Sequence, residues 1–116
     1  MNLRQKRCLF TKLISRLVIE FQELFPEYEI AYNEIKRELL VAAANAAKGT
    51  GIANSLHLIG LAADLLLYRD GVYLTKSEDY ADLGLRWESM HELCRWGGRF
   101  KRVDGNHFSI THEGRK

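Results

Sequence analysis

The fold of this chain is decided by residues 55–74, which read SLHLIGLAADLLLYRDGVYL. Leu61 to Tyr68 form a nearly continuous apolar run, and its length is typical of a buried β-strand. Asp70-Gly71 then gives a strong signal for a two-residue hairpin turn, so Val72 to Leu74 should return as the partner strand. We therefore expect an antiparallel sheet built on this hairpin.

Helical patterns flank the hairpin on both sides. Apolar residues recur every three or four positions from Leu9 onward, and this pattern stops at Pro26. Two more helices are expected, an Ala-rich one over 33–48 and one over 77–95 with Ser77 as its N-cap. The remaining chain is expected to form a loop over 48–55 and short strands over 27–32, 99–103 and 107–111.

This order of elements predicts a single α+β domain over residues 1–116, in which a small antiparallel sheet is flanked by about three helices. Residues 1–7 should be flexible. A length of 116 residues fits one domain, and a hydrophobic content of 47% is enough for an ordinary core.

Composition excludes several classes of protein. No apolar run approaches the roughly 20 residues that cross a bilayer, so we expect no stable membrane insertion. The net charge of +2 is too small to require a nucleic-acid partner. Cys8 and Cys94 are far apart and lack the CxxC spacing of a zinc or redox site, and the first residues lack the pattern of a signal peptide. We therefore expect a protein that is made in the cytoplasm with two reduced thiols. We also expect it to be a monomer.

Two clusters of His and Asp stand out against this background. Asp64 interrupts the apolar strand and needs a cation or another partner if that strand is buried. His57 lies seven residues earlier, and a bend near Gly60 would bring its imidazole toward Asp64. The second cluster is Asp104-Gly-Asn-His107, a tight turn that leads into the last strand.

These clusters contain the parts of a catalytic zinc site. Such a site takes three protein ligands and leaves one position open, and His57, Asp64 and His107 would supply the three. Asp104 would then act as general base. Two His and one carboxylate also suit non-haem iron. The alternative is a purely structural role, in which both His are ordinary surface or core residues and Asp64 pairs with an Arg.

Longer stretches of sequence around these clusters resemble the motifs of a known protein family. Residues 55–64, SLHLIGLAAD, resemble the SxHxxGxAxD motif of the D-alanyl-D-alanine carboxypeptidase family of zinc peptidases. That family includes vancomycin-resistance-type dipeptidases and the L-alanyl-D-glutamate endopeptidases of phage endolysins. WGGRF at 96–100 and DGNHF at 104–108 resemble its second signature. The resemblance covers about residues 30–112.

The resemblance implies roles for particular residues. His57, Asp64 and His107 would bind Zn²⁺, and Asp104 would be the catalytic base. Arg37 would contact the substrate carboxylate or the developing oxyanion, although Lys36 and a plain solvated helix face are alternatives. Ser55 would lie beside the site, either binding substrate or capping backbone, and Trp96 beside its two glycines would face the substrate.

The function expected from this resemblance is hydrolysis of stem-peptide bonds in bacterial peptidoglycan. Asp at position 104, where relatives also use Glu, favours an L-alanyl-D-glutamate endopeptidase of the endolysin type over a D-alanyl-D-alanine carboxypeptidase. Such an enzyme would act on the wall after release from the producing cell. The alternative from another class is a wall-binding or nucleic-acid-binding module with a structural metal.

Overall fold

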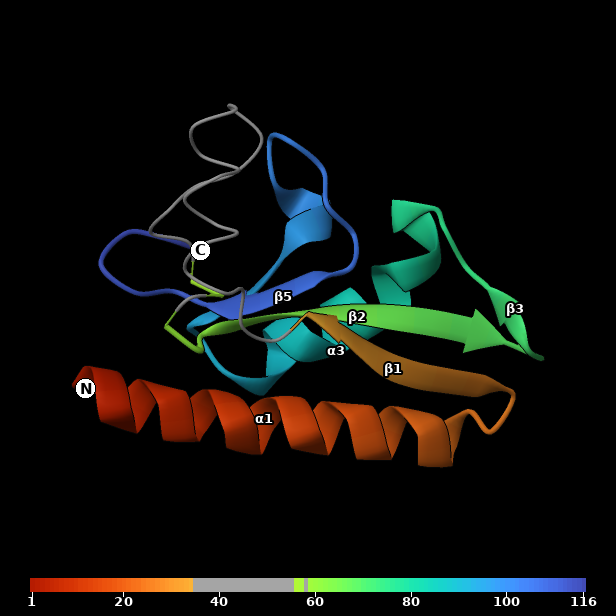
Figure 1. Ribbon diagram of the computed structural model, residues 1–116, viewed down its shortest axis with the longest axis horizontal. Coiled ribbons are helices and arrows are strands. Elements are labelled where there is room, and N and C mark those ends of the chain that lie inside the picture. The colour runs from red at the N-terminus through yellow and green to blue at the C-terminus, as the bar shows by residue number, and fades with distance from the viewer. Residues whose placement is uncertain (35–55, 58) are drawn as a thin grey trace.

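The computed structural model describes residues 1–34, 56–57 and 59–116, and in these residues it contains one antiparallel sheet and two α-helices (Figure 1). The strands are β1 (Tyr28–Glu34), β2 (Ala62–Arg69), β3 (Val72–Tyr73), β4 (Cys94–Trp96) and β5 (His107–Ile110). The α-helices are α1 (Leu3–Leu24) and α3 (Ala81–Met90), and two short 3₁₀ helices are η1 (Ser77–Tyr80) and η2 (Gly97–Arg99). The expected α+β class is confirmed.

The sheet is built around β2, as the sequence predicts. Its strand order is β1-β2-β5-β4, and β3 pairs with the far end of β2. The predicted hairpin joins β2 to β3, with positive φ angles of 50° at Asp70 and 79° at Gly71, as a tight hairpin turn requires. Both β5 and β3 pair with β2, but at different positions along it. In the stretch of β2 between them, the Leu67 N–H donates a hydrogen bond to the Tyr80 hydroxyl, which itself donates to the Leu74 carbonyl.

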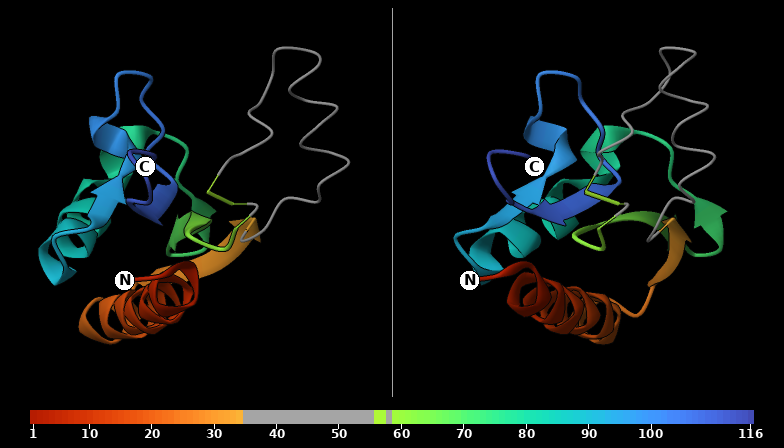
Figure 2. Two further views of the ribbon diagram at one scale, coloured as in Figure 1. Left: turned by 90° about the vertical axis from the view of Figure 1, so that its left-hand side faces the viewer. Right: turned by 60° about the vertical axis from the view of Figure 1, so that its left-hand side comes forward.

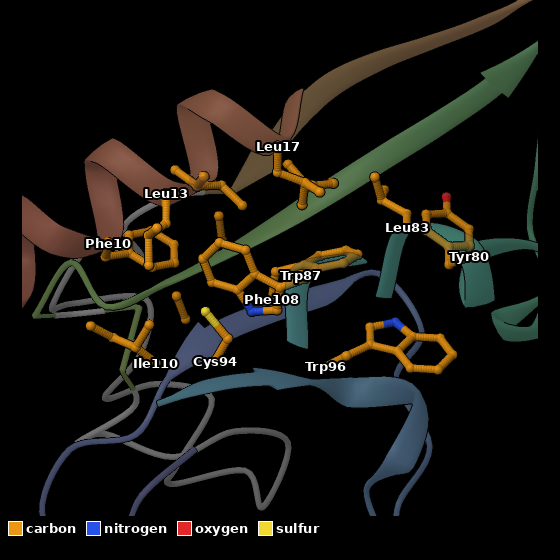
Figure 3. Close-up of a cluster of buried hydrophobic side chains, with 14 of the residues drawn as sticks. Phe10, Leu13, Leu17, Tyr80, Leu83, Trp87, Cys94, Trp96, Phe108 and Ile110 are labelled. Carbon is orange, nitrogen blue, oxygen red and sulfur yellow. The ribbon is translucent and has the colours of Figure 1, made fainter. Parts of the chain in front are cut away.

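The core lies between the sheet and the two helices (Figure 3). Trp87 of α3 is fully buried, and its ring meets Phe10 of α1 edge-on at 5.7 Å and Phe108 of β5 at 6.4 Å. Its indole N–H lies 3.0 Å from both the Arg95 and the Ser109 carbonyls, so the one polar atom of the ring is satisfied. On β2, Ala63, Leu65 and Leu67 are buried, which leaves Asp64 on the opposite face of the sheet.

The N-terminal helix is longer than its apolar pattern. It begins at Leu3, because Asn2 accepts a hydrogen bond from the Gln5 N–H and the Gln5 side chain accepts one from the Asn2 N–H. Most of the stretch expected to be flexible is therefore helical. Figure 2 shows α1 lying along one side of the sheet.

Other expected elements differ from the structure. The helix expected over 77–95 begins as η1, and its α-helical part ends at Met90. Cys94 and Trp96 instead alternate with Arg95 as a strand that pairs with β5. No strand occupies 99–103, where η2 leads into a turn. The expected helix over 33–48 and loop over 48–55 lie almost wholly outside the described residues.

Candidate metal centre

Asp64 and His107 are brought together by the register of the sheet. They lie directly opposite each other on the antiparallel strands β2 and β5, so their side chains share one face. His107 Nδ1 lies 3.8 Å from Asp64 Oδ1. Because the strand ladder sets this pairing, a one-residue slip of β5 would turn His107 to the other face.

His57 reaches the same point from the turn that precedes β2. The Gly60 N–H bonds to the His57 carbonyl, and Gly60 has a φ of 74°, which provides the bend expected near this residue. The Arg7 side chain of α1 holds the turn through a 2.6 Å hydrogen bond to the Ile59 carbonyl. As a result, His57 Nε2 lies 3.5 Å from Asp64 Oδ1.

These three side chains fit a metal ion. One ligand atom from each of His57, Asp64 and His107 lies within 4.8 Å of the other two, and among the described residues no other such group of three occurs. Tetrahedral zinc bonds of about 2.0–2.1 Å place neighbouring ligand atoms roughly 3.4 Å apart, close to the two distances above. Both His are almost fully buried, and the Asp64 carboxylate is 17% exposed.

The charge state of His107 also suits a ligand. Burial, helped by the neighbouring His57, lowers the pKa of His107 to about 4. The imidazole is therefore neutral near pH 7, as a metal ligand must be.

Asp104 lies at the start of the turn that leads into His107. Its carbonyl accepts the His107 N–H at 3.2 Å, and its own N–H donates to the Gly97 carbonyl at 2.9 Å. A Cβ on Gly97 would lie 2.0 Å from the Asp104 carbonyl oxygen, so only glycine allows the two segments to approach this closely. Partial burial raises the pKa of Asp104, although His57 and Arg102 oppose that change. A raised pKa suits a carboxylate that must accept and return a proton.

Gly105 anchors the same turn to two other segments. Its N–H donates to Ser77 Oγ at 2.9 Å, and its carbonyl accepts the Trp96 indole N–H at 2.6 Å. A Cβ on Gly105 would lie 2.4 Å from Ser77 Cα. Ser77 is thus not the predicted helix cap, because η1 begins after Lys76 and the Ser77 hydroxyl bonds the turn instead.

Trp96 contacts the turn that contains Gly105. Its side chain is 8% exposed, and a Cβ on Gly84 or on Gly98 would lie only 2.1 or 2.2 Å from its ring. The indole of the WGG motif therefore packs closely against Gly84 of α3 and Gly98 of the motif, and its N–H donates to the Gly105 carbonyl. This placement leaves the ring little surface for the substrate contact that the sequence suggested.

The structure places the remaining candidates elsewhere or does not describe them. Arg37, Lys36 and Ser55 lie outside the described residues. His91 Nδ1 accepts the Leu93 N–H, and His112 Nδ1 lies 3.1 Å from Lys6 Nζ, so neither belongs to the group of three.

Sequence reasoning missed the supporting roles of Ser77 and Gly105. It also missed Gly84, although a signal was present. A glycine inside a helix costs about 1 kcal/mol relative to alanine, which points to a close approach of another group.

Comparison with known proteins gives the family. A family model described as D-alanyl-D-alanine carboxypeptidase matches residues 48–110, more than half of the chain. The chain belongs to this family. Membership confirms the resemblance carried by the two motifs, and it supports a peptidoglycan peptidase.

One solved structure shows how far the shared fold extends. The crystal structure of the Serratia marcescens L-Ala D-Glu endopeptidase ChiX matches 95% of this chain and 84% of its own, with a TM-score of 0.76 and 24% identity. A search of curated proteins gave no match. None of the described helices is both long and apolar enough to cross a bilayer.

Proposed function

We propose that the protein is a zinc-dependent peptidase that hydrolyses stem-peptide bonds of bacterial peptidoglycan. The observation that carries this proposal is the convergence of His57, Asp64 and His107 within 4.8 Å, with Asp104 on the adjoining turn. Two imidazoles and one carboxylate are the ligand set of a catalytic zinc site that keeps a position open.

Asp104 is the acid-base residue of the proposed reaction. Zinc held by the three ligands would supply a Lewis acid that acidifies water and polarises a peptide carbonyl. Asp104 accepts a proton from the attacking water as the bond to the carbonyl carbon forms. It then returns that proton to the leaving amine as the C–N bond breaks. Partial burial raises its pKa, which makes Asp104 a stronger base toward the attacking water.

We assign substrate contacts to Arg37 and Ser55 on the family motif alone. Arg37, or Lys36 in its place, would bind a substrate carboxylate or the oxyanion. Ser55 would donate a hydrogen bond beside the metal. Arg37→Ala should then raise KM or lower kcat while the zinc content stays the same.

The favoured bond is the one between L-alanine and D-glutamate. Asp at position 104 supports this choice, as does the similar fold of an L-Ala D-Glu endopeptidase from Serratia marcescens. The alternative within the family is the D-alanyl-D-alanine bond, which is the activity in the family's description. In either case the partner is bacterial peptidoglycan, reached after release from the producing cell as an endolysin-type monomer.

The test is mass spectrometry of wall fragments after digestion of purified peptidoglycan. A new amino-terminal D-glutamyl residue identifies the endopeptidase, and release of D-alanine identifies the carboxypeptidase. If the protein binds the wall but produces no new terminus, the proposed enzyme is wrong and the protein is a binding module. Metal analysis of the same preparation should find about one zinc per chain.

A further inference from the structure

A small pocket adjoins Asp104. It has a volume of about 150 Å³ and lies between the segment that follows β3 and the turn that precedes β5. Small-molecule sites usually measure roughly 300–1,000 Å³, so this pocket accepts a single side-chain-sized group. The residues that line it are Tyr73, Thr75, Ser77, Tyr80, Val103, Asp104, Gly105 and Asn106.

The walls of the pocket offer uncharged hydrogen-bonding groups. Ser77 Oγ accepts the Gly105 N–H, which uses one lone pair and leaves its proton and second lone pair for a ligand. The Thr75 hydroxyl can donate and accept in the same way, and the Asn106 amide supplies both donors and an acceptor. Tyr80 is already bonded to two backbone groups and serves as a fixed wall.

Charge narrows the chemistry of the group that the pocket accepts. Among its lining residues in the described part of the chain, Asp104 alone is charged at neutral pH. A carboxylate in the pocket would be repelled by Asp104 and would lose water without gaining a cation. An ammonium group would pair with the Asp104 carboxylate and occupy the group that must accept a proton from water. A neutral carboxamide meets neither problem and matches the hydroxyl and amide groups.

The position of Asp104 tells which part of the substrate lies here. In the proposed reaction this residue gives its proton to the leaving amine, so the pocket beside it lies on the amine side of the scissile bond. We propose that the pocket binds the carboxamide of the residue whose amine is released, so that the protein prefers an amidated stem peptide. For an L-alanyl-D-glutamate bond, that residue is D-isoglutamine. This inference rests on the proposed function.

The first experiment compares two substrates with the zinc-loaded protein. The peptides L-Ala-γ-D-Glu-L-Lys and L-Ala-D-isoglutaminyl-L-Lys differ only in one carboxylate or carboxamide. We expect kcat/KM to be at least tenfold higher for the amidated peptide. Equal values, or a preference for the carboxylate, would overturn the proposal.

A matched pair of variants locates the preference. Thr75→Val removes a hydroxyl from the pocket at nearly constant volume and should reduce the preference for the amide several-fold. Thr11→Val is the control, because it removes a hydroxyl that donates to the Arg7 carbonyl on α1 and does not line the pocket. This variant should leave the preference for the amidated peptide unchanged. An equal effect of both substitutions would count against the pocket.

A binding measurement separates this inference from the proposed function. The product dipeptides γ-D-Glu-L-Lys and D-isoglutaminyl-L-Lys contain no scissile L-alanyl bond, so their affinities do not depend on hydrolysis. In an NMR titration the amidated product should bind at least tenfold more tightly and shift the amide signals of Ser77, Gly105 and Asn106. Selective binding without peptidoglycan cleavage would overturn the enzyme but keep the pocket. Cleavage of peptidoglycan with no selectivity in binding or rate would overturn the pocket assignment but keep the proposed enzyme.

Discussion

The strand-borne ligands and the turn-borne acid of the site are held by different kinds of contact. Asp64 and His107 face each other across the ladder between β2 and β5, so backbone hydrogen bonds fix their spacing. Asp104 lies on a turn that is fixed by close approaches at two glycines and by the side chains of Ser77 and Trp96. The difference teaches that metal binding and proton transfer can be damaged separately.

Removing a strand-borne ligand should have the largest effect. His107→Ala leaves two of the three proposed ligands, so we expect loss of nearly all bound zinc and of peptidoglycan hydrolysis. Metal analysis and a turbidity assay on purified walls measure the two losses. His91→Ala is the matched control. Because His91 lies outside the group of three, this variant should keep its zinc. Full zinc content in His107→Ala would remove this residue from the ligand set.

Changing the acid on the turn should abolish activity but spare the metal. Asp104→Asn keeps the shape of the side chain and removes its ability to accept a proton, so kcat should fall about 10²- to 10⁴-fold. Zinc content and melting temperature should stay near the wild-type values. Asp70→Asn at the hairpin is the control, since Asn tolerates the positive φ found there. Substantial activity in Asp104→Asn would show that another group moves the proton.

Displacing the turn without touching its acid should have an intermediate effect. In Gly105→Ala the new Cβ would lie 2.4 Å from Ser77 Cα, so the turn must shift. We expect a loss of about 1–3 kcal/mol in unfolding free energy and a fall in kcat, with zinc retained. Gly71→Ala is the control: its φ of 79° strains alanine too, but no atom lies within 4 Å of the added Cβ. Equal losses of kcat in both variants would mean that general destabilisation, and not turn position, explains the result.

The strand-borne part was also the easier part to predict from the sequence. The apolar run and the Asp-Gly turn specify β2 and β3, and the two motifs name the strand-borne Asp64 and His107 together with His57 on the preceding turn. The turn-borne part depends on contacts between distant segments, such as that between Ser77 and Gly105, which local patterns do not encode. For the same reason the helix expected up to Arg95 was wrong. Residues 94–96 gain more by pairing with β5 and burying Cys94 and Trp96 than by extending α3.

The smallest expected effect concerns the charge beside the turn. The Arg102 guanidinium favours the ionised form of Asp104, so Arg102→Gln should raise the pKa of Asp104 further. The general base must be ionised to act, and therefore the acid limb of the pH–rate profile should move to higher pH. Because Arg102 is exposed, the rate at mildly acidic pH should fall only about two- to fivefold. Lys101→Gln removes a neighbouring exposed charge and should leave the limb in place, and the shift should shrink at high salt. An acid limb that moves equally in both variants would mean that it reports the overall charge of the surface and not the ionisation of Asp104.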